Sequence, residues 1–556
     1  MARALPAVKR HRAGALLAGA WLALSAAPAF AAVDLVIEAI RERVDLERDT
    51  GQLTIAGREI VSRVNLPAIY DERGFEPLWS DPSQVDELVG LVEGSYEDGL
   101  LPVDYHLTAL LRLMQAVAVD PSPGNRADLD VLATDAFILL LYHLYFGKVD
   151  PKSVTPTWNF PTRQIDGRSA ASFVTEAITS GRLREALDAA RPGHWMYEHG
   201  RKALAAYRGI AARGGWPTVP AGETLKPGMT DPRVAAVRRH LAVTGDLVDL
   251  PLDSWDYDEA LAEAVRSFQA RHLLTPDAAV GKATLAELNV PVADRIRQIR
   301  VNLERGRQIL HEIGDDDLVL VDIAGYEVRY VRERRVVWSS RVVVGQPYRQ
   351  TPIFQAQIEY VVFNPTWTVP PGILQKDILP AVRKDTGYLS KRGLQVVDRN
   401  GRPMDPAGID WHRYTGNSFP WFVRQEPGPE NALGRVKIMF PNPHLVYLHD
   451  TPSRSLFEKD DRAFSSGCIR VQRPFELVEL LLADPAWDQA AFETVIASGA
   501  TRTVRLARPV RVLLIYWTVD EDDAGRIVFK RDVYDRDPAL ARALDARFAF
   551  GSRPEI

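Results

Sequence analysis

The spacing of hydrophobic residues changes along the chain, from a helical period to a strand period, near residue 316. Before that point apolar residues recur at i, i+3, i+4 and i+7, as they do at Val85, Leu88, Val89 and Val92. Ser83 precedes this set and is a candidate helix cap. Beyond residue 316, β-branched runs separated by short turns predict antiparallel strands. The pattern therefore predicts a multidomain α+β protein with its helices first and a mostly β unit last.

Residues 33–225 form the predicted helical scaffold domain. A second long apolar segment, from Leu129 to Phe146, lies inside it. We find no cluster of side chains in this region that suggests catalysis, so we interpret it as structural. A linker rich in proline and glycine, from Gly214 to Met229, leads to the next unit.

Residues 230–290 predict a small unit of three helices. The segments Ala264 to Gln269 and Thr284 to Leu288 resemble the Ala-Val-x-x-Phe-Gln and Thr-x-x-x-Leu motifs of the peptidoglycan-binding domain family. Leu273 and Ala278 stand where that family usually has glycine. The packing residues survive these changes, whereas the resemblance does not fix the turn conformations or the binding surface. The resemblance implies the family fold, and it leaves glycan binding open.

Residues 316–540 form the predicted β-rich domain. Its expected strands are 318–323, 326–331, 336–345, 358–363, 436–440, 445–448, 510–517 and 526–533. We expect the last two to form a pair. A tight turn or strand start is expected from Ser465 to Arg470, with a helix from Pro474 to Leu482 just beyond it.

Residues 364–434 interrupt this domain with a segment of different character. It contains a helix-like stretch from Lys376 to Lys384 and several aromatic residues, among them Trp421. An insertion that joins two core strands next to a reactive site is a candidate lid. A packed surface subdomain without a gating role explains the same pattern equally well.

The first residues have the features of a secretory signal. A basic start is followed by an apolar run from Ala13 to about Ala27 and then by Ala29-Phe30-Ala31. This order predicts a signal peptide over residues 1–31, cleaved near Ala31. A membrane anchor is the alternative, but the run is shorter than the roughly 20 apolar residues that a spanning helix needs. No later segment looks long and apolar enough to span, so we expect no stable membrane span after cleavage.

Composition narrows the class of partner. The chain has 556 residues, of which 46% are hydrophobic and 25% charged, so it is too long for one core and is expected to form several globular domains. A formal net charge of −5 provides no broad basic surface, which argues against nucleic acid as a partner. The single cysteine excludes an internal disulfide and a multi-thiolate metal site. We expect no metal and no cofactor.

That cysteine, Cys468, is the strongest candidate for chemistry. It follows small residues and lies nineteen positions after His449. A thiolate is a strong nucleophile, and an imidazole can accept the thiol proton near neutral pH. An oxyanion formed by the attack needs hydrogen-bond donors, for which the N–H groups of Gly467 and Cys468 are placed. The alternative is a buried structural thiol.

Two motifs carry a resemblance to a known catalytic domain. His449-Asp450-Thr451-Pro452 and Ser465-Ser466-Gly467-Cys468-Ile469-Arg470 together resemble the signature of the L,D-transpeptidase (YkuD-like) family. The order of signal peptide, helical scaffold, peptidoglycan-binding domain and catalytic domain resembles the large multidomain Gram-negative branch of that family. The resemblance implies a periplasmic enzyme of cell-wall organisation.

The reaction that the resemblance implies is acyl transfer between peptidoglycan stems. The thiol attacks the meso-diaminopimelate carbonyl of a tetrapeptide stem, the terminal D-alanine leaves, and a second stem accepts the acyl group in a 3→3 cross-link. Tetrapeptide stems are therefore the expected donor and acceptor, and periplasmic proteins are the expected class of protein partner.

The resemblance also assigns roles around the cysteine. The backbone carbonyl of Asp450 is expected to orient the imidazole. Arg470 either holds a stem-peptide carboxylate or braces the loop, and bracing is the preferred interpretation. Ser466 replaces a histidine that is common in the family. The candidates for substrate binding are Arg470, Ser466, Trp421 and Tyr447.

Three alternatives to transpeptidation stay open on the same fold. If water accepts the acyl group, the enzyme is an L,D-carboxypeptidase. If it cuts the link between peptidoglycan and a lipoprotein, as some relatives do, it is an amidase. A non-catalytic wall-binding scaffold requires Cys468 to be buried and unreactive.

Overall fold

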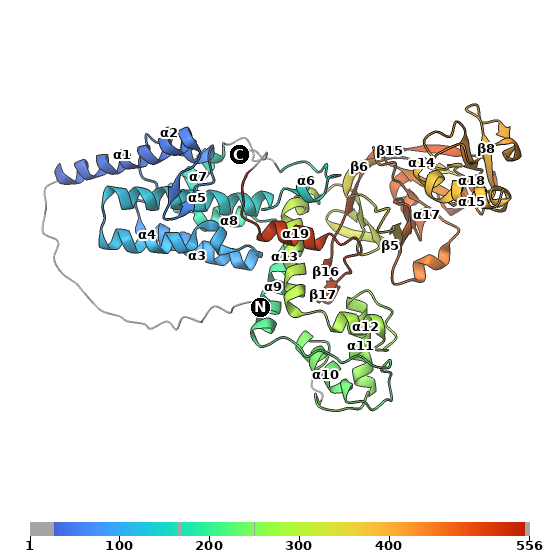
Figure 1. The fold of residues 1–556 in the computed structure, drawn as a ribbon, viewed down its shortest axis with the longest axis horizontal. Coiled ribbons are helices and arrows are strands. Elements are labelled where there is room, and N and C mark those ends of the chain that lie inside the picture. Colours follow the sequence, from blue (N-terminus) through green and yellow to red (C-terminus); the bar gives the residue numbers. More distant parts are fainter. Residues whose placement is uncertain (1–26, 164–168, 249–250, 551–556) are drawn as a thin grey trace.

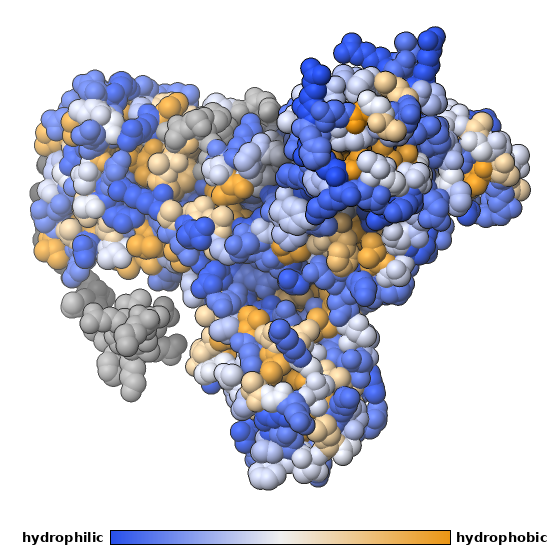
Figure 2. Space-filling view, turned by 45° about the vertical axis from the view of Figure 1, so that its right-hand side comes forward, coloured by the Kyte–Doolittle hydropathy of each residue, from blue (hydrophilic) through white to orange (hydrophobic). Residues whose placement is uncertain are grey.

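The computed structural model describes residues 27–163, 169–248 and 251–550, with side chains from residue 34 onward. Residues 1–26 of the predicted signal peptide lie outside this description, and the predicted cleavage site near Ala31 falls within the helix Ala27–Thr50. Figure 1 shows a helical lobe, a small second helical lobe and a β-rich lobe. Figure 2 shows the same lobes with largely hydrophilic outer surfaces. The multidomain α+β class predicted from the sequence is confirmed.

The first lobe is a bundle of helices. Its helices are α1 (Ala27–Thr50), α2 (Asn65–Glu72), α3 (Pro82–Gly94), α4 (Leu107–Val119), α5 (Pro123–Phe146), α6 (Pro151–Val154), α7 (Ala170–Thr179) and α8 (Leu183–Ala190), with 3-10 turns η1 (Ser95–Asp98) and η2 (Pro102–Tyr105) and a short hairpin of β1 (Thr54–Ile55) and β2 (Arg58–Glu59). The predicted cap of α3 was wrong by two residues. The side chain of Asp81 accepts the N–H of Ser83 at 2.9 Å, so aspartate is the cap.

Helix α5 is the core of this lobe. Helices α1, α3, α4 and α8 all pack against it. It is long and apolar enough to cross a membrane by length and composition, which corrects the expectation that no later segment would be. However, 78% of its apolar window is buried inside the structure. A helix that is hydrophobic on all sides is typical of such a surrounded position as well as of a membrane span.

The second lobe contains α10 (Arg233–Thr244), α11 (Glu259–Arg271) and α12 (Lys282–Leu288). Leu273 and Ala278, which replace the glycines of the family pattern, both adopt left-handed backbone with φ of 54° and 60°. The glycine conformation is therefore kept without glycine, at some steric cost. Gln269 holds the second turn, since its amide donates to Ala279 O at 3.0 Å and accepts from Ala278 N at 2.9 Å.

The third lobe is a nine-stranded sheet that curls back on itself. Its strand order is β13-β5-β14-β12-β11-β6-β15-β3-β4, and β4 also pairs with β5. The strands are β3 (Leu318–Asp322), β4 (Glu327–Arg332), β5 (Arg335–Gly345), β6 (Phe354–Phe363), β11 (Val436–Met439), β12 (Leu448–His449), β13 (Ala463–Ser465), β14 (Ile469–Val471) and β15 (Arg502–Ile515). Helices α17 (Pro474–Leu482) and α18 (Gln489–Ala497) follow β14.

The prediction of antiparallel strands was only partly right. Three pairs are parallel: β15 with β3, β12 with β14, and β13 with β5. The predicted pair at the end of the chain was also wrong, because β15 joins the large sheet while β16 (Val519–Glu521) and β17 (Ile527–Phe529) form a hairpin of their own. Alternation along one strand predicts a strand but not its partner, which is chosen by the path of the whole chain.

The insertion forms a separate subdomain with its own core. It has a four-stranded sheet in the order β7-β10-β8-β9, made of β7 (Trp367–Thr368), β8 (Leu394–Val397), β9 (Pro403–Met404) and β10 (Phe422–Gln425). A continuous helical stretch comprises α14 (Pro371–Ile373), the π-helical turn η4 (Leu374–Ile378) and α15 (Leu379–Lys384), and α16 (Tyr388–Lys391) follows. Asn431 closes the base of the subdomain by donating to Pro365 O at 3.0 Å.

Three helices join the lobes. Helix α13 (Val292–Ile309) packs against α9 (Trp195–Ala212), α5 and α19 (Asp537–Asp545). At its C-terminal end α13 continues into the 3-10 turn η3 (Leu310–Glu312), which leads into β3. Figure 1 shows α13 and α19 at the centre, between the helical and β-rich lobes. Leu544, on α19, lies in the core of the helical lobe, so the end of the chain returns to the first lobe.

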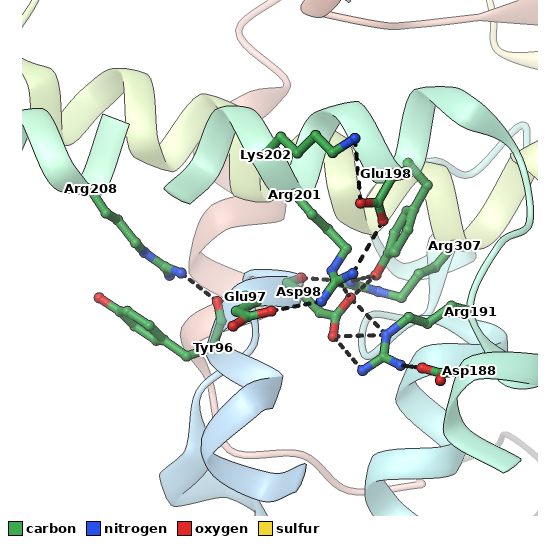
Figure 3. Close-up of polar contacts among 11 residues, drawn as sticks. Tyr96, Glu97, Asp98, Asp188, Arg191, Glu198, Arg201, Lys202, Arg208 and Arg307 are labelled. Carbon is green, nitrogen blue, oxygen red and sulfur yellow. Dashed lines mark hydrogen bonds and ion pairs between the residues drawn. The ribbon is translucent and has the colours of Figure 1, made fainter. Parts of the chain in front are cut away.

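Charged groups reinforce this junction, as Figure 3 shows around Asp98. The buried carboxylate of Asp98 pairs with Arg191 and Arg201, each at 3.0 Å. The fully buried Arg307 of α13 donates to Asp98 O at 2.8 Å and pairs with Glu304 at 2.6 Å. Because a buried charge is tolerated only when it is paired, this cluster fixes the helical lobe to the central helix.

Candidate active site

Strand pairing brings the two candidate catalytic residues to one place. In the parallel pair of β12 and β14, Leu448 lies opposite Ile469, and His449 lies opposite Arg470. Cys468 immediately precedes β14, and Ile469 N donates to Tyr447 O at 3.0 Å. The eighteen residues between the histidine and the cysteine therefore fold into a crossover that brings the chain back beside β12.

Alternation sorts the side chains of these strands into two faces. Leu448 and Ile469, together with Ile438 of the neighbouring β11, are fully buried in the lobe's core. The opposite face carries the polar residues, because successive side chains point to opposite sides of a sheet. These are Lys437, which lies opposite His449 in the register, and Tyr447, His449, Cys468 and Arg470.

The imidazole of His449 is held by the residue that follows it. His449 Nδ1 lies 2.5 Å from Asp450 O, which accepts the hydrogen bond. A proton on Nδ1 leaves Nε2 with a free lone pair, the form that can accept a thiol proton. The Asp450 carboxylate accepts from Arg435 N at 2.8 Å and pairs with Arg454, and these contacts fix the peptide that orients the ring.

The turn that carries Cys468 is stapled by Ser465. Ser465 Oγ donates to Cys468 O at 2.5 Å and accepts from Gly467 N at 3.1 Å. Gly467 has φ of 116°, in a region that strongly favours glycine. The Gly467 N–H is thus engaged inside the turn. The Cys468 N–H has no hydrogen-bond acceptor within the part of the chain that the structure describes.

A second set of hydrogen bonds anchors this turn to the core. The buried Thr351 donates through Oγ1 to Gly467 O at 2.9 Å and accepts from Gly345 N at 2.9 Å. The hydroxyl of Tyr534 accepts from Thr351 N at 3.1 Å and donates to Gly345 O at 2.7 Å. The position of the cysteine therefore depends on residues far from it in the chain, both before it and after it.

Burial keeps the two reactive groups neutral. It raises the pKa of the Cys468 thiol above its ordinary value, although Tyr447, Lys437 and Arg470 act in the opposite direction. Burial, with the positive charge of Arg470, lowers the pKa of His449 to about 3. At neutral pH the site therefore holds a thiol, whose Sγ donates to Leu445 O at 3.8 Å, and a neutral imidazole, rather than a preformed thiolate–imidazolium pair.

The charge state of the cysteine affects the pKa values of two neighbouring groups on the same face. Burial raises the pKa of Tyr447 well above its ordinary value, and the nearby thiolate adds to the effect. Burial lowers the pKa of Lys437, whose Nζ lies 3.8 Å from the centre of the Tyr447 ring. Once a thiolate or an oxyanion forms, Lys437 and Arg470 provide nearby positive charge to stabilise it.

The remaining predicted substrate-binding residues are placed differently. Arg470 Nε is buried without a hydrogen-bond partner within the described residues, so no hydrogen bond of that atom supports the preferred bracing interpretation. Ser466 is exposed, and its Oγ accepts from Arg349 at 2.8 Å. The ring of Trp421 contacts Tyr414 and Phe419 inside the insertion, so it packs into that subdomain's core.

Several residues of the site escaped sequence reasoning. They are Ser465 as the staple of the turn, and Thr351, Tyr534, Lys437 and Arg349. Arg349 and Thr351 belong to the segment Arg349-Gln-Thr-Pro352, and this short motif was the one signal in the sequence that could have drawn attention to them. Tyr534 and Lys437 show no local pattern, because only the strand order brings them near.

Comparison with known families agrees with this geometry. Residues 316–505 match the L,D-transpeptidase catalytic domain (YkuD), residues 230–288 match the "Putative peptidoglycan binding domain", and residues 65–204 match the Scaffold domain. The resemblance inferred from the motifs is confirmed. The chain therefore contains a YkuD-type L,D-transpeptidase catalytic domain together with a domain of the peptidoglycan-binding family.

Individual relatives cover parts of the chain. A protein of Haemophilus influenzae named "Putative L,D-transpeptidase" is 36% identical over 219 residues, which are 39% of this chain and 44% of that protein. The match thus spans less than half of the relative's length. An L,D-transpeptidase structure from Xylanimonas cellulosilytica is 16% identical with a TM-score of 0.17, and it covers 53% of this chain and 99% of its own. One from Stackebrandtia nassauensis is 13% identical with a TM-score of 0.22, covering 54% and 96%.

Proposed function

We propose that this chain is an L,D-transpeptidase that forms 3→3 cross-links in peptidoglycan through an acyl-thioester on Cys468. The observation that carries the proposal is the shared face of β12 and β14. There His449 has its Nδ1 on Asp450 O, and Cys468 lies two residues before Arg470, the register partner of His449. This arrangement supplies a nucleophile, a base in the required tautomer and an orienting group, which together define nucleophilic acyl transfer.

Acylation begins with the neutral pair. As Cys468 Sγ attacks the carbonyl carbon of meso-diaminopimelate, its proton passes to His449 Nε2, and the carbonyl oxygen becomes an oxyanion. The Cys468 N–H is the backbone donor available to that oxyanion, and Lys437 and Arg470 add positive charge. The carbon–nitrogen bond to D-alanine then breaks, and the imidazolium gives its proton to the departing amine.

Transfer repeats these steps in reverse. An amine of a second stem gives a proton to His449 Nε2 as it attacks the thioester carbonyl. The carbon–sulfur bond breaks, and the thiol recovers the proton. Arg470, with its unpartnered Nε on the same face, is our candidate for a stem-peptide carboxylate. Tyr447 provides the aromatic wall beside the nucleophile, and the predicted signal peptide places the reaction in the periplasm.

The test uses the mature chain and purified disaccharide-tetrapeptides, analysed by mass spectrometry beside Cys468→Ala. A dimer that has lost one D-alanine, absent with the variant, supports both the cross-linking reaction and the role of the thiol. Tripeptide monomers without dimers indicate an L,D-carboxypeptidase. If neither product forms, the proposal fails, and lipoprotein-link chemistry or a wall-binding scaffold becomes the better explanation.

A further inference from the structure

Arg349 connects the catalytic turn to the insertion. It lies in the loop between β5 and β6, and its Nη1 donates to Ser466 Oγ at 2.8 Å. Its two terminal nitrogens donate to the two carboxylate oxygens of Asp377 at 2.5 and 2.9 Å. Asp377 belongs to the π-helical turn η4 of the insertion. The guanidinium therefore already holds a carboxylate, in bidentate geometry, beside the catalytic turn.

The loop of Arg349 borders the turn that carries the nucleophile. A Cβ placed on Gly467 would lie 3.6 Å from Gln350 O and 3.8 Å from Arg349 O. Ser466, which Arg349 contacts, is separated from Cys468 by Gly467 alone. The cation is thus within reach of a substrate group that extends one residue beyond the bond under attack.

The two partners of this ion pair differ in how firmly they are held. The Arg349 side chain is 14% exposed, and the Asp377 side chain is 43% exposed. Asp377 also comes from a subdomain with a hydrophobic core separate from that of the large sheet. The cation is fixed to the catalytic lobe, while its carboxylate partner is accessible to exchange.

We propose that Arg349 is the receptor for the carboxylate of the donor stem's terminal D-alanine, and that Asp377 occupies this receptor until the substrate replaces it. The proposal rests on the proposed function. D-Alanine is the leaving group, so its carboxylate lies beside the scissile bond and hence beside Cys468. Exchange of one carboxylate for another keeps the guanidinium paired throughout, which avoids the penalty of a buried unpaired charge.

The receptor gives the site a preference between stems. A planar guanidinium matches a carboxylate through two parallel hydrogen bonds, and Ser466 fixes its orientation. A stem that still ends in D-alanine presents its carboxylate at this point, whereas a stem whose terminal carboxyl is blocked does not. Arg349 therefore selects intact tetrapeptide donors.

The test measures binding to the full chain carrying Cys468→Ala, which prevents turnover. The probes are a disaccharide-tetrapeptide and the same compound with its terminal carboxyl converted to a carboxamide, titrated by calorimetry. Amidation is expected to weaken binding about tenfold or more, the size of a lost charge-assisted hydrogen bond. Arg349→Met is expected to weaken binding of the free acid similarly and to be insensitive to amidation.

Asp377→Asn is the matched control, because it breaks the same ion pair from the other side. A receptor predicts opposite signs: Asp377→Asn tightens binding of the free acid while Arg349→Met weakens it. A structural tie predicts equal weakening by both, with no effect of amidation, and this result overturns the proposal. Absence of any binding by the free acid overturns it as well. Arg349→Lys, which keeps the charge but not the fork, replaces Arg349→Met if that variant does not fold.

Failure of the proposed function gives a different result. Carboxylate-dependent binding in the Cys468→Ala chain, combined with no turnover of tetrapeptide by the unmodified chain, contradicts the transferase while the receptor stands. Turnover with full activity on the amidated tetrapeptide leaves the transferase in place and overturns the receptor.

Discussion

Burial decides the behaviour of single residues at this site. His449 is 4% exposed and Cys468 is half-buried, so each favours its neutral form. The thiol is therefore not activated in advance. In the proposed mechanism it depends on a base that is already deprotonated and correctly aligned, and the contact of His449 Nδ1 with Asp450 O at 2.5 Å would provide that alignment.

The lowered pKa of His449 predicts that kcat/KM does not fall on the acid side of neutrality. Because this pKa is lowered to about 3, the imidazole is the neutral base throughout the range from about pH 5 to pH 8. We expect kcat/KM to show no inflection near 6.5, the ordinary histidine value. A profile of kcat/KM against pH checks this, with histidine NMR titration of the protein and of His449→Gln to assign the resonance. A clear loss of activity below pH 6.5 would show that His449 titrates normally.

Ser465 is expected to act as a positioning residue. Ser465→Ala removes the oxygen that joins Gly467 N to Cys468 O, so the turn loses its staple. We expect kcat to fall by about 10- to 100-fold, with KM nearly unchanged and a stability loss of about 1–3 kcal/mol. Steady-state kinetics and thermal unfolding measure the two effects. Wild-type kcat in the variant would contradict the role.

Each lobe has its own hydrophobic core, and the core of the second lobe includes side chains that can titrate. The second lobe buries two histidines, His240 and His272, against Phe268. Burial lowers the pKa of His240 to about 3 and that of His272 well below its ordinary value. Both rings are therefore neutral in the folded lobe at every pH near neutrality.

These histidines make the second lobe sensitive to acid. Below about pH 6.5 the unfolded chain binds protons that the folded lobe excludes, so stability is lost as the pH falls toward the folded value. For His240 this loss is on the order of 2 kcal/mol between pH 6.5 and pH 4.5, and His272 acts in the same direction. His240→Phe keeps the aromatic contacts and removes the titration. We expect its thermal unfolding to depend less on pH over this range than that of the wild type. An unchanged pH dependence would contradict this account.

The whole molecule is held together at the centre by α13. This helix contacts α5 of the helical lobe, the long helix α9 and the start of the β-rich lobe. Helix α19, near the C-terminus, packs against it as well. In Figure 3, Arg201 of α9 pairs with Glu97 and Asp98 of the helical lobe, whereas the pair of Asp98 with Arg191 lies within that lobe. Arg307 of α13 also donates to Asp98 O. The lobes are therefore coupled through buried ion pairs as well as through apolar contacts.

Loss of Asp98 is expected to weaken this junction strongly. Asp98→Asn leaves Arg191 and Arg201 without their buried carboxylate, and removing one partner of a buried pair costs about 3–5 kcal/mol. Asp188→Asn is the control: it removes another partner of Arg191, but Asp188 is 62% exposed, so we expect a cost below about 1 kcal/mol. Denaturant unfolding of the full chain measures both. Equal effects would show that burial does not govern the junction.

Much of the fold and of the site could be predicted from local patterns. The helix from Pro474 to Leu482 and most strands of the large sheet occur where the periodicity places them, because amphipathic spacing reports directly on one buried face. Cys468 and His449 were visible because thiol and imidazole chemistry is carried by the residue type itself. The parallel pairings were missed, because a local pattern does not specify which other segment a strand pairs with.

Residue types, local periodicity and short motifs were enough to predict the class of protein and to single out Cys468 and His449 as the candidates for nucleophile and base. Only the tertiary structure decided that Thr351 and Tyr534 anchor the cysteine turn, that burial keeps thiol and imidazole neutral, and that Arg349 holds Asp377 beside Ser466. Contacts of this kind join segments far apart in the chain, and desolvation depends on everything that surrounds a group, so neither can be read from neighbouring residues.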